Sequence, residues 1–257
     1  MQDREFKPWG LIKSLFISNY TVKTNTMKQL FISMLLFSFV ATQAQQKIND
    51  NWADWANFKK YADQNKSVPA KIKGERRVVF LGNSIFEGWL RLRPEFFAGK
   101  PYFDRGISGQ TTPQMLLRFY EDVLALQPDV LVLKCGINDI AQNTGPYDPQ
   151  KTINNIKAIA QLARANKIKV ILCSVLPASD FKWRPGLEPA DKVIALNAAI
   201  KQFSDEQSFY YLDLYSSVVD ENKGMKKEYA NDGVHPTVEG YKVLEPLVEA
   251  AIQKVKK

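Results

Sequence analysis

The stretch "VVFLGNSIFEGW", residues 78–89, decides the fold. An apolar run typical of a strand stops at Gly-Asn-Ser, and apolar and aromatic residues at helical spacing follow directly. Ser84 and Glu87 match the S-x-x-E capping box, in which a serine hydroxyl accepts a hydrogen bond from a helix amide. The same turn would also display the Ser84 hydroxyl as a nucleophile at the carboxyl edge of a sheet. Both roles are open at this point.

The remainder of the chain repeats this alternation of apolar runs and helical patterns. The apolar runs cover residues 77–81, 102–107, 130–135, 170–176 and 209–214. The helical patterns cover residues 84–97, 112–126, 149–167, 189–206 and 238–254. Near-continuous apolar strands separated by helices are typical of a parallel sheet buried on both faces. We therefore predict a single α/β domain with three layers, α/β/α.

Glycines and short polar residues follow the apolar runs, at the edge where open parallel sheets bind ligands. The segments after the five runs are Gly-Asn-Ser at 82–84, "RGISGQTT" at 105–112, "CGIND" at 135–139, "PASDFKWRPGLEPAD" at 177–191 and "NDGVHPT" at 231–237. Because the carboxyl ends of parallel strands meet at one edge, residues from these segments are candidates for a common site.

The last of these segments contains His235, the only histidine of the chain, three residues after Asp232. A serine nucleophile needs a general base, and the base needs a carboxylate that fixes its tautomer. A D-x-x-H segment supplies both if the two side chains face each other. The pattern predicts Ser84, His235 and Asp232 as a catalytic triad.

Gly109 and Asn138 are candidates for an oxyanion hole. Acyl transfer places negative charge on the former carbonyl oxygen in the transition state, and preorganised donors stabilise that charge. A glycine amide can approach the oxygen closely, Asn138 offers a side-chain amide, and the Ser84 backbone amide would lie at a helix N-terminus. A turn glycine and a helix cap are the ordinary roles of such residues. Their occurrence at separate strand ends favours the catalytic interpretation.

Four segments resemble the blocks of the SGNH or GDSL-type serine hydrolases. "FLGNSI" is similar to the first block, with Ser84 at the nucleophile position, and "RGISGQTT" to the second, with Gly109 as the oxyanion glycine. "CGIND" resembles the third block, with Asn138 as the oxyanion asparagine, and "DGVH" the last, with Asp232 and His235. The blocks occur in the order of the family.

The resemblance extends from about residue 76 to the C-terminus. It implies a flavodoxin-like fold with a five-stranded parallel sheet, an open active site, carboxylic ester hydrolysis, and neither a metal nor a cofactor. One position departs from the family pattern: Asn83 stands where an aspartate usually precedes the serine. This exchange removes a negative charge beside the nucleophile.

The expected substrate is a small-molecule or saccharide ester with a short, acetyl-like acyl group. Phe181, Trp183 and Arg184 form an aromatic and cationic loop, in which Trp183 could pack on a sugar ring and Arg184 could hold an acidic sugar. Ordinary packing is the alternative role of Trp183. The alternatives to a carbohydrate esterase are a lysophospholipase or thioesterase of the same family and a glycan-binding protein without turnover.

The N-terminal part of the sequence predicts that the protein is exported. Residues 27–44 have a lysine, a short apolar stretch and small residues up to Ala44, which is the order of a signal peptide, and the apolar stretch is too short to span a bilayer. We expect an upstream extension at 1–26, cleavage after Ala44, one domain at 45–257, and a secreted or periplasmic protein without a membrane span.

The charge and the cysteines of the chain are ordinary for a globular domain. The formal charge of +8 is dispersed, so no nucleic-acid site is expected. Cys135 and Cys173 lie in apolar runs, and we expect free thiols.

Overall fold

The computed structural model describes residue 29, residues 32–34 and residues 54–256. The chain divides into two units, residues 1–54 and residues 55–257, and the fold described below is that of the second unit. Apart from helical residues 29 and 32–34, the predicted signal peptide and upstream extension lie outside the described residues. None of the helices in the described ranges is long and apolar enough to cross a bilayer.

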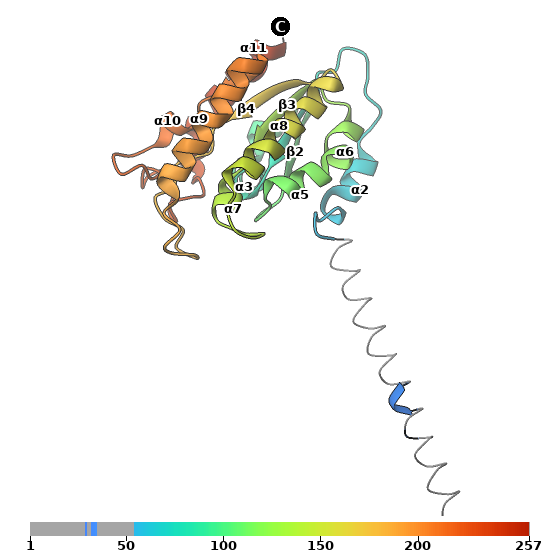
Figure 1. Ribbon diagram of the computed structural model, residues 1–257. Coiled ribbons are helices and arrows are strands. Elements are labelled where there is room, and N and C mark those ends of the chain that lie inside the picture. Colours follow the sequence, from blue (N-terminus) through green and yellow to red (C-terminus); the bar gives the residue numbers. More distant parts are fainter. Residues whose placement is uncertain (1–28, 30–31, 35–53, 257) are drawn as a thin grey trace, which may run out of the picture. The chain divides into compact units, whose positions relative to one another are not determined.

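Five parallel strands form one sheet in the order β2-β1-β3-β4-β5 (Figure 1). The strands are β1 (Val78–Gly82), β2 (Tyr102–Gly106), β3 (Val130–Lys134), β4 (Lys169–Cys173) and β5 (Tyr210–Leu212). Each coincides with one of the predicted apolar runs, so the predicted class and strand number are confirmed. The chain continues from β1 to β2 on one side and reaches β3 on the other. Ligands of open α/β sheets bind at such a switch point, here the carboxyl end of β1.

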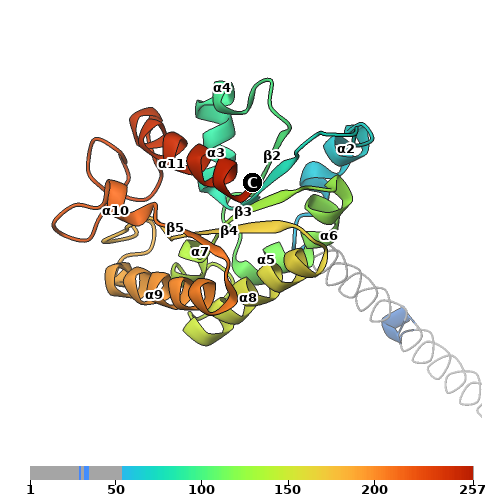
Figure 2. The same cartoon turned by 90° about the horizontal axis from the view of Figure 1, so that it is seen from above.

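Helices cover both faces of the sheet (Figure 2). One face carries α3 (Ser84–Leu92), α4 (Pro94–Phe97) and the C-terminal α11 (Val238–Lys256), with α10 (Tyr215–Val218) in contact with α11. The other face carries α5 (Thr112–Leu117), α8 (Pro149–Ala165) and α9 (Pro189–Gln207). The short helix α7 (Ile137–Ile140) follows β3, and α2 (Lys59–Ser67) contacts α6 (Phe119–Asp122).

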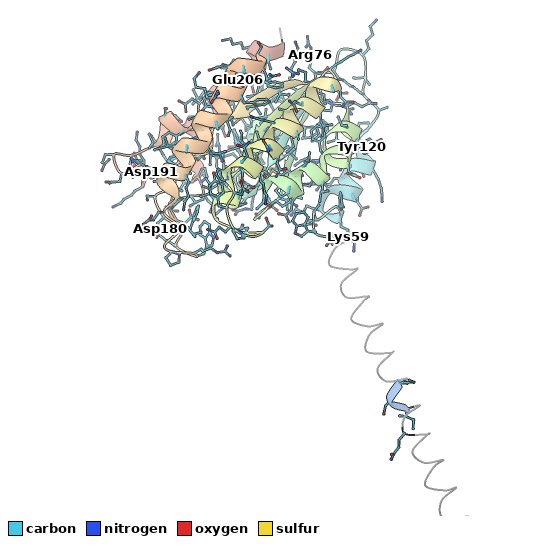
Figure 3. All side chains as sticks on the ribbon, viewed as in Figure 1. Lys59, Arg76, Tyr120, Asp180, Asp191 and Glu206 are labelled. Atoms are coloured by element: carbon cyan, nitrogen blue, oxygen red, sulfur yellow. The ribbon has the colours of Figure 1, made fainter. Side chains whose placement is uncertain are left out.

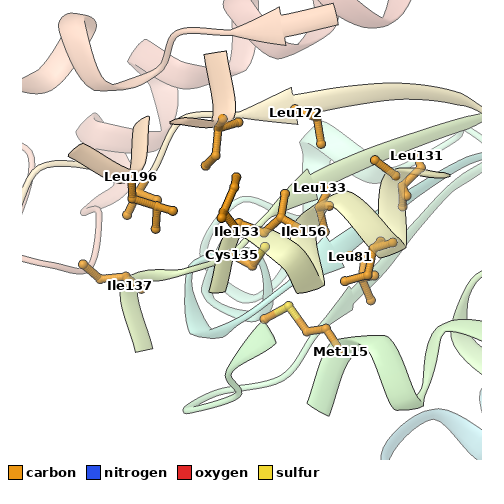
Figure 4. Close-up of a cluster of buried hydrophobic side chains, with 14 of the residues drawn as sticks. Leu81, Met115, Leu131, Leu133, Cys135, Ile137, Ile153, Ile156, Leu172 and Leu196 are labelled. Carbon is orange, nitrogen blue, oxygen red and sulfur yellow. The ribbon is translucent and has the colours of Figure 1, made fainter. Parts of the chain in front are cut away.

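Two apolar cores hold these layers together, because successive strand residues point to opposite faces of the sheet. Val79, Leu81, Leu131 and Leu133 pack toward α5, α8 and α9. Figure 4 shows part of this core, with Leu81, Leu131 and Leu133 labelled. The alternate residues of the same strands, among them Phe80 and Val132, pack toward α3 and α11.

The two cysteines belong to different cores. Cys135 packs on the α8 side and Cys173 on the α11 side, and both are buried free thiols, as predicted. Burial raises the pKa of the Cys173 thiol to about 12, so the thiol stays protonated at neutral pH.

Two of the predicted helices are divided in the structure. The pattern over 84–97 forms α3 and α4, since Arg93 leaves helical geometry before Pro94, a residue that restricts its predecessor. The pattern over 112–126 forms α5, α6 and a 3-10 turn, Leu124–Leu126. The second division falls at Arg118, whose guanidinium donates to the Gly82 carbonyl at the carboxyl end of β1 and to the Gln110 side chain.

Candidate active site

Ser84, His235 and Asp232 form a continuous hydrogen-bonded relay at the carboxyl edge of the sheet. The Ser84 Oγ lies 2.8 Å from Nε2 of His235, and the other ring nitrogen, Nδ1, lies 2.6 Å from Oδ2 of Asp232. The fold thus brings together residues that are 151 positions apart in the chain. The distances are those of a nucleophile, a base and an orienting carboxylate.

The carboxylate of Asp232 is fixed by its own loop. Its Oδ1 accepts hydrogen bonds from the backbone amides of Val234 (2.9 Å) and His235 (2.8 Å), while Oδ2 faces the His235 ring. Partial burial opposes ionisation of Asp232, but the hydrogen bonds from the His235 amide, the His235 ring and the Val234 amide hold its pKa below the usual range. An ionised Asp232 places the imidazole proton on Nδ1 and leaves the lone pair of Nε2 facing Ser84.

The capping role predicted for Ser84 and Glu87 is wrong. The N-cap of α3 is Asn83, whose Oδ1 accepts a hydrogen bond from the amide of Ile85 (3.1 Å). Ser84 is already the first helical residue, which leaves its hydroxyl to His235. Asn83 is an effective cap, so the exchange from the family aspartate preserves this hydrogen bond.

Glu87 instead joins three segments around the site. Its carboxylate accepts hydrogen bonds from the Ser108 amide (2.7 Å), from the Ser108 hydroxyl (2.5 Å) and from Nζ of Lys60 in α2 (2.5 Å). The carboxylate therefore ties α3, which carries Ser84, to the loop that carries Gly109. We call these three residues the Glu87 clamp. The sequence held no separate signal for it, because the spacing from Ser84 matched a capping box.

The two predicted oxyanion residues are held by the same loop and by α7. Gly109 has φ +78°, a left-handed conformation that favours glycine, although a Cβ there would meet no atom closer than 3.8 Å. The conformation of the backbone, rather than lack of space, is therefore what requires glycine. Asn138 is buried, and its Nδ2 donates to the carbonyl of Gln110 (2.9 Å), which fixes the side chain and leaves a second N–H on the same nitrogen.

The loop between β4 and α9 places one predicted residue beside the triad. Trp183 is 48% exposed, and the centroid of its ring lies 6.2 Å from that of the His235 ring. Arg184 has another partner: its Nη1 donates to the carbonyls of Ala141 (2.7 Å) and Gln142 (2.6 Å), at the C-terminus of α7. The Arg184 guanidinium thus fastens its loop to the segment that follows Asn138.

A buried carboxyl group that the sequence did not predict lies on β2, the strand that packs against α3. Asp104 on β2 accepts a hydrogen bond from the Gly106 amide (2.7 Å), while its Oδ2 is buried without a partner among the described residues. Burial raises the pKa of Asp104 to about 7. A Cβ on Gly106 would lie 2.4 Å from the Glu87 amide, so the glycine lets α3 approach β2. An acidic residue in a predicted strand was the signal that could have found this carboxyl group.

A cleft of about 710 Å³ opens beside the triad between α3 and the start of α11. Its lining residues are Ser84, Glu87, Gly88, Leu90, Arg91, Leu92, Ser108, Asp232, His235, Pro236 and Tyr241. The described part of the chain contains no group of three metal-ligating side chains.

Comparison with known proteins places the chain in a family. Residues 80–243 match the GDSL-like lipase/acylhydrolase family, and the chain belongs to it. The five-stranded parallel sheet between two layers of helices agrees with this family, so the predicted family and fold are confirmed.

Among solved structures, the chain is similar to one described as an acylhydrolase from Bacteroides fragilis, with a TM-score of 0.78 and 47% identity over 79% of this chain and 99% of that one. Among curated proteins it is similar to an acetylxylan esterase of Xylanibacter ruminicola, 27% identical over 73% of this chain and 45% of the relative. An acetylxylan esterase of Geobacillus stearothermophilus is 25% identical over 55% of this chain and 67% of that protein. The chain thus spans about half the length of the first of these curated relatives.

Proposed function

We propose that this protein is a secreted serine esterase that removes short acyl groups, above all acetyl groups, from carbohydrates. The observation that carries the proposal is the relay from Ser84 through His235 to Asp232, at 2.8 and 2.6 Å, on the fold of an ester hydrolase family. The two curated relatives are both acetylxylan esterases, which supports an acetylated saccharide as the substrate class.

In the proposed reaction, Nε2 of His235 takes the proton of Ser84 as Oγ attacks the ester carbonyl. The negative charge that develops on the carbonyl oxygen is stabilised by the amides of Ser84 and Gly109 and by the Asn138 side chain. The intermediate collapses to an acetyl-enzyme, and His235 returns the proton to the departing sugar hydroxyl. Water then attacks the acetyl-enzyme with His235 again as base, which releases acetate and restores Ser84.

The saccharide part of the proposal rests on the surface beside the relay. Trp183 presents a half-exposed ring next to His235, and an aromatic face next to the reacting ester offers packing to a sugar ring. The predicted signal peptide at 27–44 belongs to the same proposal, since a polysaccharide substrate would be met outside the cytoplasm.

A panel of esters tests the proposal. Aryl acetate, butyrate and octanoate, an acetylated xylo-oligosaccharide and a lysophospholipid are assayed with the purified protein. We expect hydrolysis to fall with acyl length and acetate to be released from the oligosaccharide. Ser84→Ala and His235→Ala should each abolish most of this turnover, and the double variant should be scarcely slower than either, because the two residues act as one unit.

Other outcomes would overturn the proposal. Preference for the octanoate or the lysophospholipid would identify a lipid-directed or thioester-directed hydrolase of the same family. Saccharide binding without acetate release would identify a glycan-binding protein. Near-wild-type turnover by folded His235→Ala would mean that the relay is not responsible for the hydrolysis.

A further inference from the structure

The cleft beside the triad extends along one face of α3. Ser84, Glu87, Gly88 and Arg91 all line it, and the spacing i, i+3, i+4 and i+7 places them on one face of the helix. Arg91 is two turns from Ser84, roughly 10 Å along the helix axis at about 1.5 Å per residue. A saccharide whose acetyl ester lies at the Ser84 hydroxyl could therefore reach Arg91 with a neighbouring sugar unit.

The two carboxylates that line the cleft already accept hydrogen bonds from neighbouring residues, whereas the guanidinium of Arg91 donates none to any residue that the structure describes. Glu87 accepts from Ser108 and Lys60, and Asp232 accepts from His235. Arg91 is exposed, and its side chain has no hydrogen bond or ion pair with any described residue. Its neighbour Arg93, by contrast, is held by two hydrogen bonds of 2.9 Å to Glu245.

Arg184, the arginine predicted to hold an acidic sugar, is less suited to this task. Its Nη1 donates to two backbone carbonyls, those of Ala141 and Gln142, and so positions a loop. Arg91 is the arginine that lines the cleft of Ser84 and His235, and its donors are available to a ligand.

We propose that Arg91 forms a subsite for a carboxylate, so that acetylated saccharides with a uronic acid beside the acetylated sugar are preferred substrates. This inference rests on the proposed function. A guanidinium fits a carboxylate with two parallel hydrogen bonds. Among the residues that line the cleft, Arg91 is also the one lysine or arginine, so it is the cation available to an anionic substrate that approaches Ser84.

The test compares two acetylated xylo-oligosaccharides of equal length, one neutral and one with a glucuronic acid branch next to the acetylated unit. The measured quantity is the ratio of kcat/KM for the acidic substrate to kcat/KM for the neutral one. We expect Arg91→Gln to lower this ratio roughly 2- to 5-fold, the range of an exposed charge pair, and added salt to lower it in the wild type. Arg91→Lys should lie between the two, because it keeps the charge and loses the paired hydrogen bonds.

Arg76→Gln is the matched control. Arg76, labelled in Figure 3, is also exposed, and its side chain has no hydrogen bond or ion pair within the described ranges. It precedes the amino end of β1, whereas Ser84 follows the carboxyl end of the same strand. The ratio should be at the wild-type value in this variant. A ratio that is unchanged in Arg91→Gln, or that falls equally in Arg76→Gln, would overturn the subsite and leave the proposed function intact. If the wild type releases acetate from neither oligosaccharide, the proposed function fails and the subsite fails with it.

Discussion

At the scale of single residues, the site depends on groups whose orientation is fixed by the surrounding protein. Asn138 donates one N–H to the Gln110 carbonyl and so keeps a fixed orientation, while Gly109 keeps its loop in a left-handed conformation. Such preorganisation lets a donor act on the transition state without reorienting first.

Replacement of Asn138 tests this arrangement. Asn138→Ala removes one donor to the developing oxyanion, so kcat for an aryl acetate should fall about 10²- to 10³-fold with KM little changed. Steady-state kinetics measure both constants. Asn154→Ala, on the exposed face of α8, serves as the control and should behave as the wild type. An unaltered kcat in Asn138→Ala would show that Asn138 only shapes the turn after β3 and does not act on the oxyanion.

The sequence predicted the relay residues because each belongs to a short segment directly after a strand, where topology alone brings side chains together. It failed for Glu87, since a capping box and a link to a distant loop have the same local spacing. It also gave no sign that Nη1 of Arg184 donates to the carbonyls of Ala141 and Gln142, because those two residues lie some 40 positions away in the chain. The residue spacing within one segment does not indicate hydrogen bonds to a segment that is distant in the sequence.

At the scale of elements, the Glu87 clamp makes α2 part of the site, although α2 precedes residues 80–243 that match the family. Lys60 donates to Glu87, and the hydroxyl of the buried Tyr61 donates to the Gly106 carbonyl at the end of β2. Partial burial opposes ionisation of Glu87, but the hydrogen bonds from Lys60 and Ser108 hold its pKa below the usual range. The charged form of Glu87 is thus the one that holds the loop.

Glu87→Gln should loosen this connection. The amide keeps one acceptor oxygen and adds N–H donors that face Lys60 and Ser108, so we expect kcat to fall several-fold, with KM for an aryl acetate almost unchanged. Since the pKa of Glu87 is lowered in the fold, its stabilising contribution is present at neutral pH and is lost as pH falls through the folded pKa. Thermal unfolding at pH 7 and at pH 3 should therefore differ less in the variant than in the wild type. Glu239→Gln, at an exposed ion pair with Lys242, is the control. Equal kcat values for Glu87→Gln and the control would restrict the clamp to a structural role.

The elements themselves were predicted well where apolar runs continue without interruption. The five strands follow the runs closely, because strands buried on both faces tolerate few polar residues. Helix boundaries near Arg93 and Arg118 were missed, since tertiary packing and a proline decide them rather than periodicity.

At the scale of the whole molecule, Asp104 couples stability to pH. Burial raises its pKa to about 7, and the hydrogen bond from the Gly106 amide and the charges of Arg105 and Arg118 only partly offset this. In the unfolded chain the same group would titrate near 3.9. Between these two values the native state binds more protons than the unfolded state, so the contribution of Asp104 to the free energy of unfolding decreases as pH rises from about 4 to about 7.

Asp104→Asn should remove this pH dependence. Relative to the wild type, the variant should gain stability as pH rises through this window, by at most about 4 kcal/mol for a pKa difference of about three units. Urea unfolding at pH 4, 6 and 8 measures the difference. Asp205→Asn, at an exposed pair with Lys201, is the control and should show no such trend. A parallel pH dependence in Asp104→Asn and the wild type would contradict the burial of a titrating carboxyl.

The single histidine has a practical consequence. Every imidazole signal in an NMR spectrum of the intact chain must come from His235, because the sequence contains no other imidazole. The ring contacts Ser84 on one nitrogen and Asp232 on the other, so those signals report directly on the hydrogen bonds of the relay. The unmodified protein therefore carries its own spectroscopic label at the reacting centre, and inhibitor binding or acyl-enzyme formation could be followed there without isotope-selective mutagenesis.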